Sequence, residues 1–308
     1  MSGSEPAYIR ALKNGTLRKS METARHRLRS CTLCPRKCGV DRKAGQIGTC
    51  QTGADAQVSS CTPHFGEESP LAGTRGSGTI FFTHCNLLCQ FCQNYEISHL
   101  GHGQVASTEQ LADMMLRLQD AGCHNINLVT PSHVIPMILS AVETAAVKGL
   151  DVPLVYNTSA YDRVTSLKLL DGVVDIYMPD FKFWDSRVAE ITCQAPDYPA
   201  VARKALREMH RQVGDLIIDA SGLARKGLLI RHLVLPGGLA GSRKIMRFIA
   251  RKISPNSYVN IMAQYRPCGT ASQIEGLSAF LSKKEYQEAL RAAGEEGLTR
   301  LDMPERFF

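Results

Sequence analysis

From residue 79 onward, short apolar runs alternate with segments of helical periodicity. The runs predict six buried strands, namely Thr79–Thr83, Asn125–Thr130, Val152–Asn157, Val173–Met178, Leu228–Leu235 and Tyr258–Met262. Ser107 and Gln110 have the spacing of a capping box and predict a helix that ends near Gly122. A second helix is expected from Pro131, at its first position, to Gly149.

Strands that alternate with helices predict parallel pairing through crossover connections. Six strands are fewer than the eight of a closed barrel, so a lateral opening is expected. We therefore predict an α/β fold, a partial (β/α)6 TIM-like barrel with a small cysteine-rich N-terminal segment. In such folds the chemistry lies at the carboxyl ends of the strands.

The first 75 residues have a different pattern. Residues 16–30 predict a helix with Leu17, Met21, Ala24 and Leu28 on one stripe and arginines opposite. Residues 39–78 are rich in Gly, Ser and Thr without a helical period, and we expect loops and short strands around a metal. The predicted division is residues 1–75, a basic helix and metal-binding segment, and residues 76–308, the barrel.

Composition narrows the class of protein. The chain has 308 residues, of which 44% are hydrophobic and 21% charged, as in ordinary globular proteins. We find no apolar run long enough to cross a membrane and no apolar signal region at the start, so we expect a cytoplasmic protein without a membrane partner. Eleven cysteines in such a chain indicate metal sites rather than disulfides.

The net charge of +7 is concentrated near the N-terminus. Eleven Lys and Arg lie between Arg10 and Lys43, against only Glu22 and Asp41. This basic arm suits an acidic protein or a nucleic acid, and it is equally typical of a solvated helix face.

Three cysteines, Cys85, Cys89 and Cys92, follow the first predicted barrel strand with the spacing C-x3-C-x2-C. Each thiolate on such a loop can bind one iron of a [4Fe–4S] cluster, which leaves the fourth iron open to a small molecule. The alternative is a structural zinc site that His84 or His99 completes.

This spacing after a barrel strand, with Phe91 before the last cysteine, resembles the signature of the radical S-adenosylmethionine (SAM) superfamily. Further stretches resemble the poorly characterised branch related to pyruvate formate-lyase activating enzyme. They are residues 64–68, 76–85, 92–98, 125–133, 178–182, 231–237 and 264–267. The resemblance implies a [4Fe–4S] cluster that reductively cleaves SAM to a 5′-deoxyadenosyl radical, with reduced ferredoxin or flavodoxin as electron donor.

The resemblance also implies cofactor-binding positions at successive strand ends, with Lys182 near the methionine carboxylate. The expected residues are Asn125, Asn127, Asn157, Ser159, Asp180, Lys182 and Arg231. The glycine–glutamate pair common in the family is missing at the second strand, and Gln264 and Tyr265 stand where a histidine is common. Polar residues at strand ends are also frequent caps. Glu67 and Glu68 are either exposed or near the substrate.

A second group of cysteines, Cys31, Cys34, Cys38 and Cys50, precedes the barrel. Four thiolates complete either a second iron–sulfur cluster or a tetrahedral zinc site. Ligand type alone does not decide between them.

Three functions compete. The first is a radical SAM enzyme that abstracts hydrogen from a protein or peptide, like a glycyl-radical activase. The second is the same chemistry on a nucleic acid or small metabolite, for which the arginines at 25, 27 and 29 would matter. The third is a non-catalytic metal-binding adaptor.

Overall fold

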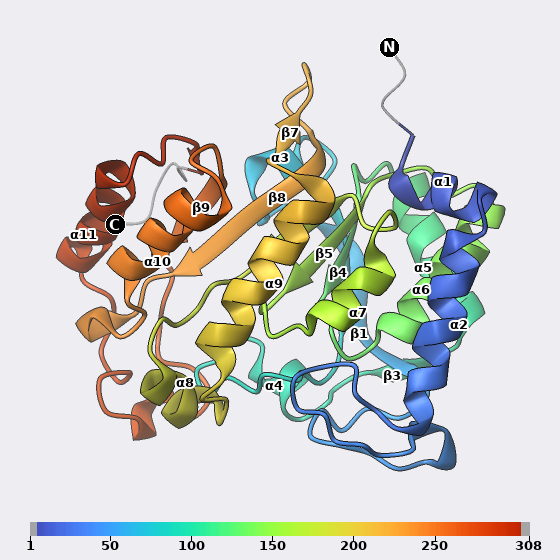
Figure 1. The fold of residues 1–308 in the computed structure, drawn as a ribbon, viewed down its shortest axis with the longest axis horizontal. Helices are drawn as coiled ribbons and strands as arrows, with labels where there is room; N and C mark the ends of the chain where they lie inside the picture. The colour runs from blue at the N-terminus through green and yellow to red at the C-terminus, as the bar shows by residue number, and fades with distance from the viewer. Residues whose placement is uncertain (1–4, 303–308) are drawn as a thin grey trace.

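A sheet of ten strands runs through the middle of the described part of the molecule (Figure 1). The computed structural model describes residues 5–302. The strands are β1 (Ala56–His64), β2 (Ser77–Phe82), β3 (Gln104–Ala106), β4 (Ile126–Val129), β5 (Leu154–Thr158), β6 (Ile176–Pro179), β7 (Ile217–Ile218), β8 (Ala224–Leu233), β9 (Tyr258–Met262) and β10 (Leu301–Asp302). β2, β4, β5, β6, β8, β9 and β10 are parallel neighbours in that order. β1 and β3 add antiparallel pairs at the β2 edge.

Helices connect the strands and cover the sheet (Figure 1). They are α1 (Ala7–Lys13), α2 (Thr16–His26), α3 (Ser69–Ala72), α4 (Tyr95–Ser98), α5 (Thr108–Asp120), α6 (Ile135–Val147), α7 (Val164–Leu167), α8 (Ser186–Cys193), α9 (Tyr198–Val213), α10 (Ser242–Phe248) and α11 (Lys283–Glu295). Short helical turns are η1 (Arg27–Arg29), η2 (Arg42–Ala44), η3 (Lys168–Leu170), η4 (Pro236–Gly238), η5 (Ile249–Ile253) and η6 (Ala271–Gln273). α5 packs on α6, and α6 in turn carries α1 and α2.

The predicted partial barrel is confirmed. All six predicted strands are present, as β2, β4, β5, β6, β8 and β9, and their order in the sheet follows their order in the chain. In the described residues β3 and β10 are the two edges, so the sheet stays open. The capping box is also confirmed. Gln110 N donates to Ser107 Oγ at 3.2 Å, and Ser107 N donates to Gln110 Oε1 at 2.8 Å.

Two local predictions were wrong. The polar stretch that we expected to form loops and short strands contains β1, nine residues long, because pairing with β2 supplies backbone hydrogen bonds that the local pattern does not reveal. The helix expected from Pro131 begins at Ile135, with Pro136 in its first turn. Ser132 and His133 instead form a turn whose side chains bond to Thr158 and to a backbone carbonyl.

The N-terminal helices are fixed to the barrel by apolar contacts and by one buried carboxylate. Leu17, Ala24 and Leu28 are buried in the main core, which confirms the predicted stripe. Asp175 accepts hydrogen bonds from the backbone N of Ala7 (2.8 Å) and of Leu154 (2.9 Å), so it joins α1 to β5. The division at residue 75 stays a prediction, and β1 on one side of it pairs with β2 on the other.

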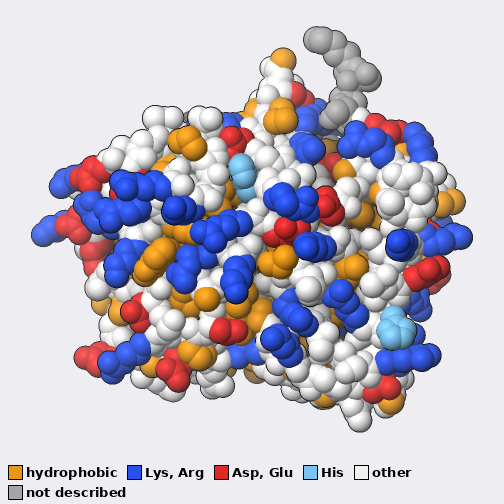
Figure 2. Space-filling view, viewed as in Figure 1, with side chains coloured by type: hydrophobic (Ala, Val, Ile, Leu, Met, Phe, Trp, Pro, Cys, Tyr) orange, Lys and Arg blue, Asp and Glu red, His pale blue; other side chains and the backbone are white. Residues whose placement is uncertain are grey.

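Figure 2 shows Lys and Arg side chains spread over the face on which α9 and α10 lie. Several of them form ion pairs. Arg211 pairs with Glu208, while Arg247 and Arg251 both pair with Glu296. Positive charge therefore predominates on this face, and these carboxylates pair with part of it. Among residues 5–302, no helix combines the length and apolar character needed to span a bilayer.

Candidate functional site

The cysteine loop follows β2 directly, at the carboxyl end of the parallel strands. His84 (φ 63°) and Leu88 (φ 58°) both have left-handed backbone conformations, so the chain turns sharply before Cys85 and before Cys89. Cys92 N donates to Cys89 O at 3.0 Å and closes the last turn. These turns bring all three cysteines to the wall of one cavity.

The three thiols fit the ligand set of an iron–sulfur cluster. Burial raises the pKa of Cys85 to about 12, and burial also raises the pKa of Cys92. Such thiols stay protonated near neutral pH until a metal displaces the proton. No three His, Cys, Asp or Glu side chains of residues 5–302 converge on one metal ion. A [4Fe–4S] cluster needs no such convergence, because each thiolate binds a different iron.

The cavity has a volume of about 310 Å³ and lies between the cysteine loop and the carboxyl ends of the strands. Five of the seven predicted cofactor-binding residues line it. They are Asn157, Ser159, Asp180, Lys182 and Arg231. The tertiary structure therefore gathers side chains from β5, β6 and β8 opposite the thiols.

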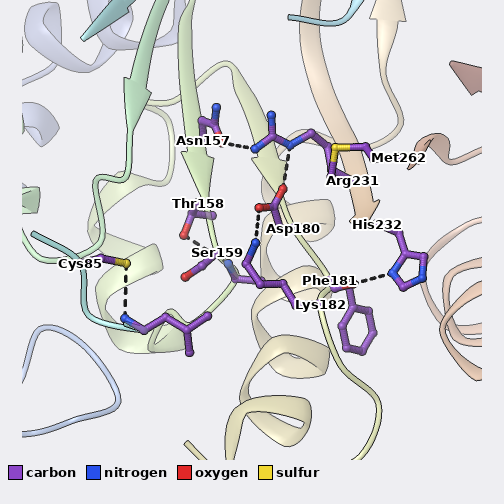
Figure 3. Close-up of polar contacts among 12 residues, drawn as sticks. Cys85, Asn157, Thr158, Ser159, Asp180, Phe181, Lys182, Arg231, His232 and Met262 are labelled. Carbon is purple, nitrogen blue, oxygen red and sulfur yellow. Dashed lines mark hydrogen bonds and ion pairs between the residues drawn. The ribbon is translucent and has the colours of Figure 1, made fainter. Parts of the chain in front are cut away.

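A chain of polar contacts joins four of these residues (Figure 3). Asp180 Oδ2 lies 2.6 Å from Lys182 Nζ, and Asp180 Oδ1 lies 2.7 Å from Arg231 Nε. Arg231 Nη2 donates to Asn157 Oδ1 at 2.8 Å. Figure 3 shows Cys85 across the cavity from this network.

The charges in the network stabilise one another. Burial opposes the ionised form of Asp180, but Arg231 and Lys182 outweigh it and lower the pKa of this carboxyl to about 2. Burial likewise disfavours the cations, and Asp180 raises the pKa of both Lys182 and Arg231 above their usual values. At neutral pH Asp180, Lys182 and Arg231 thus place two cations around one carboxylate.

Glu67 supplies a further carboxyl that can ionise near neutral pH. Its Oε2 lies 3.4 Å from Arg231 Nη1, and its Oε1 accepts a hydrogen bond from Asn127 Nδ2 at 3.0 Å. Burial raises the pKa of Glu67 to about 7, against the opposing effect of Arg231. Glu67 lines the cavity, whereas Glu68 is buried beside it and bonds Asn260 at 2.8 Å. Asn127 therefore reaches the cavity through Glu67.

Two of the predicted positions differ in their surroundings. Asn125 lies outside the cavity lining, where it bonds Ser77 Oγ (2.6 Å) and the Leu71 carbonyl (2.9 Å). Ser159 lines the cavity, and its buried Oγ has no hydrogen-bond partner. A buried hydroxyl without a partner is costly, so Ser159 fits a position that a bound ligand completes.

Tyr198, the first residue of α9, is a positioning residue that no motif or spacing in the sequence singles out. Its hydroxyl accepts from Lys182 N (2.9 Å) and lies within hydrogen-bond distance of the carbonyl oxygens of Ser159 (3.0 Å) and Asp180 (2.8 Å). One buried hydroxyl thus fixes the backbone of three cavity residues. Only the contact between α9 and the ends of β5 and β6 creates this role.

Gln264, two residues after the end of β9, also lines the cavity. Tyr265 is buried instead, with its ring 6.0 Å from that of Phe91 in the cysteine loop. Phe91 also packs edge-on against Phe183 at 5.8 Å. Phe91 itself lines the cavity, so these aromatic contacts fix one part of the cavity wall.

The N-terminal cysteines also come together. Cys31, Cys34, Cys38 and Cys50 surround one small cavity, together with Arg42 and His133. The backbone closes the loop, since Cys31 N donates to Val40 O and Gly39 N to Cys31 O, both at 2.9 Å. Four sulfur donors line this one space, as expected, although no three of them converge on a single ion, and the metal itself stays a prediction.

Comparison with known proteins gives three findings. A sequence model of the radical SAM superfamily matches residues 79–219, from β2 to just past β7. An uncharacterized protein of Methanocaldococcus jannaschii is 30% identical in an alignment 290 residues long, which covers 92% of this chain and 79% of that protein. The crystal structure of methylornithine synthase (PylB) is similar with a TM-score of 0.44 and 17% identity over 71% of this chain; the chain covers 62% of that structure.

Proposed function

The chain belongs to the radical SAM superfamily, and from this we propose that it is an enzyme that abstracts hydrogen from a protein or peptide, in the manner of a glycyl-radical activase. The observation that carries the proposal is the single cavity that three thiols and a buried network of two cations share. We also propose the branch related to pyruvate formate-lyase activating enzyme, a cytoplasmic location, and reduced ferredoxin or flavodoxin as donor.

Cys85, Cys89 and Cys92 would hold a [4Fe–4S] cluster. Held there and reduced by the donor, such a cluster would supply the one electron for reductive cleavage of the S–C5′ bond of SAM, the chemistry that leads to hydrogen abstraction from the substrate. The protein's part is to bind, to orient and to exclude water.

The cations on the facing wall would bind the carboxylate of SAM. Lys182 has three N–H donors, and Asp180 occupies one of them at 2.6 Å. When Glu67 is protonated, the two positive charges of Lys182 and Arg231 and the one negative charge of Asp180 leave a net charge of plus one. This excess favours an anion in the cavity, and the Ser159 hydroxyl offers a neutral hydrogen bond beside it.

A protein or peptide substrate is supported by apolar side chains around the cavity. Phe65 is 64% exposed between two cavity-lining residues, and Leu100 is 57% exposed just beyond α4. A peptide bound at the cavity would cover the apolar surface of both side chains, which favours its binding. One of the three arginines that favoured a nucleic-acid substrate is already engaged within the protein. Arg27 Nη1 donates to the Thr165 carbonyl and to Ser166 Oγ, both at 3.3 Å.

The test is release of 5′-deoxyadenosine by anaerobically reconstituted, dithionite-reduced protein. We expect Cys89→Ala to lose this release and Cys61→Ala, outside both cysteine groups, to keep it. A peptide deuterated at the glycine Cα should then transfer deuterium into 5′-deoxyadenosine. A wild-type chain that binds neither iron nor SAM would contradict the enzyme and favour the adaptor.

A further inference from the structure

Arg42 is a buried cation at the edge of the N-terminal cysteine group. Its side chain is only 1% exposed. Arg42 Nε donates to Gly53 O (2.7 Å) and Nη1 to His133 O (2.8 Å), and Nη1 lies 4.0 Å from Cys31 Sγ. Its Nη2 is buried without a hydrogen-bond partner. These partners are two carbonyls and a thiol, so none of them balances the guanidinium charge.

The unbalanced charge of the buried Arg42 guanidinium, beside four cysteines, has a simple chemical explanation. Burying a charge without a counter-charge is costly, and thiols do not supply one. Four thiolates around a divalent ion or a [4Fe–4S] core carry net negative charge. Such a centre would balance Arg42 and give its free N–H group a sulfur acceptor.

Two segments of the N-terminal cysteine loop, around Cys38 and around Gly48, approach each other closely, as a compact metal centre requires. A Cβ atom at Gly48 would lie 2.7 Å from Cys38 Sγ, so only glycine allows the two segments to meet there. Cys38 Sγ lies 3.4 Å from Thr49 N, which precedes Cys50. The last cysteine is thereby fixed next to the first three.

A second arginine connects this cysteine group to the one at the barrel. Arg36 lies between Cys34 and Cys38, and it donates from Nε to Asn86 O (3.0 Å) and from Nη2 to Leu87 O (3.1 Å). Asn86 and Leu87 are the residues immediately after Cys85 in the barrel loop.

The same guanidinium reaches the end of α8. Its Nη2 donates to the carbonyl oxygen of Cys193 at 2.7 Å, and its Nη1 donates to that of Gln194. The ring of Tyr161 lies 5.3 Å below its central carbon. Figure 1 shows the N-terminal loop at the same end of the molecule as α4 and α8. Arg36 therefore ties the barrel cysteine loop to a helix terminus.

We propose that Cys31, Cys34, Cys38 and Cys50 bind one metal–thiolate centre of net negative charge, which Arg42 balances, and that this centre holds Arg36 as a clamp on the barrel cysteine loop. Residues 31–33 are held by the burial of Leu33 and by hydrogen bonds from Arg163 and Ser166 to the carbonyls of Thr32 and Leu33. The centre would extend this anchor through Arg36 to Cys50. The clamp fixes the turn between Cys85 and Cys89, which is the geometry that a cluster needs.

The metal is tested without reference to radical chemistry. In a full-length chain with Cys85, Cys89 and Cys92 all changed to Ala, one metal centre per chain should remain. Adding Cys31→Ser and Cys34→Ser should remove it, whereas adding Cys61→Ser should not. Elemental analysis distinguishes the two possible identities of this N-terminal centre: the Cys31→Ser and Cys34→Ser changes remove zinc if it is a zinc site, and iron with sulfide if it is an iron–sulfur cluster. Equal metal in all three chains would overturn the proposal.

The clamp is tested in the otherwise unchanged protein, and this step rests on the proposed barrel cluster. We expect Arg36→Ala to lose the barrel cluster several-fold faster to a chelator than the wild type, with the N-terminal metal retained. Arg29→Ala removes an exposed arginine of the same segment and should behave as the wild type. An unchanged rate in Arg36→Ala, with a normal unfolding curve, would refute the clamp and leave the metal centre standing.

Discussion

Lys182 Nζ lies 2.6 Å from Asp180 Oδ2, while the other oxygen of Asp180 binds Arg231. Both residues follow β6, and both line the cavity. The shared carboxylate holds two cations in fixed positions without neutralising both of them. This arrangement explains how a buried wall stays able to attract an anion.

Changing Lys182 to Met should weaken SAM binding and leave the cluster intact. A hydrogen bond to a charged group contributes about 1.5–3 kcal/mol, so we expect a loss of affinity of roughly tenfold to a hundredfold. Equilibrium dialysis with labelled SAM, together with iron analysis, measures both. Lys204→Met, at an exposed position of α9, is the matched control. Equal affinities in the two variants would argue against a role for Lys182.

The binding of SAM should depend on the charge of Glu67. The pKa of Glu67 is about 7, so its protonated form leaves net positive charge in the network and its ionised form removes it. Affinity should therefore fall as pH rises through about 7. Glu67→Gln should stay at the tighter level across this range, and Glu68→Gln should keep the pH dependence. A pH profile that Glu67→Gln does not flatten would assign the titration to another group.

The same raised pKa predicts a direction for stability. Since the pKa of Glu67 is raised above 4.5, the fold favours the protonated form. Its contribution is present below about pH 4.5 and is lost as pH rises through about 7. Urea unfolding of wild type and Glu67→Gln should therefore converge at acidic pH, with the variant more stable above pH 7. A variant that loses stability above pH 7 would contradict this sign.

Asp175 should be important for stability rather than chemistry. Asp175→Ala leaves the backbone N–H groups of Ala7 and Leu154 without their acceptor, and we expect a loss of about 2–4 kcal/mol in the free energy of unfolding. Asp113→Ala removes only a surface pair with Lys148 and should cost less than about 1 kcal/mol. Urea titration followed by circular dichroism distinguishes the two.

Gly269 should be needed for the cluster loop. Its φ is 56°, and a Cβ atom there would lie 2.5 Å from the carbonyl oxygen of Gln90, between Cys89 and Cys92. Gly269→Ala should therefore lower the iron content of the barrel site. Gly297→Ala is the control, because Gly297 has a φ of 81° and no heavy atom within 4 Å of that position. Both variants bear the backbone cost of about 1 kcal/mol, and only the first displaces the loop.

The sequence by itself determined the strand–helix alternation, the partial barrel and the two groups of cysteines. These depend on apolar periodicity, capping residues and short spacings, which act over a few neighbouring residues. The same local signals misplaced the start of α6 and underestimated the length of β1, whose backbone partner lies in β2.

Only the tertiary structure decided which polar residues share the cavity and which merely support it. Glu67 meets Arg231 across 164 residues of chain, and Arg36 meets the Leu87 carbonyl across 51. Tyr198 fixes the site from a helix that carries no site motif. Asn125, at a strand end like Asn157, faces Ser77 instead of the cavity. Such contacts depend on the way the strands close around a common centre, and no pattern of neighbouring residues contains that information.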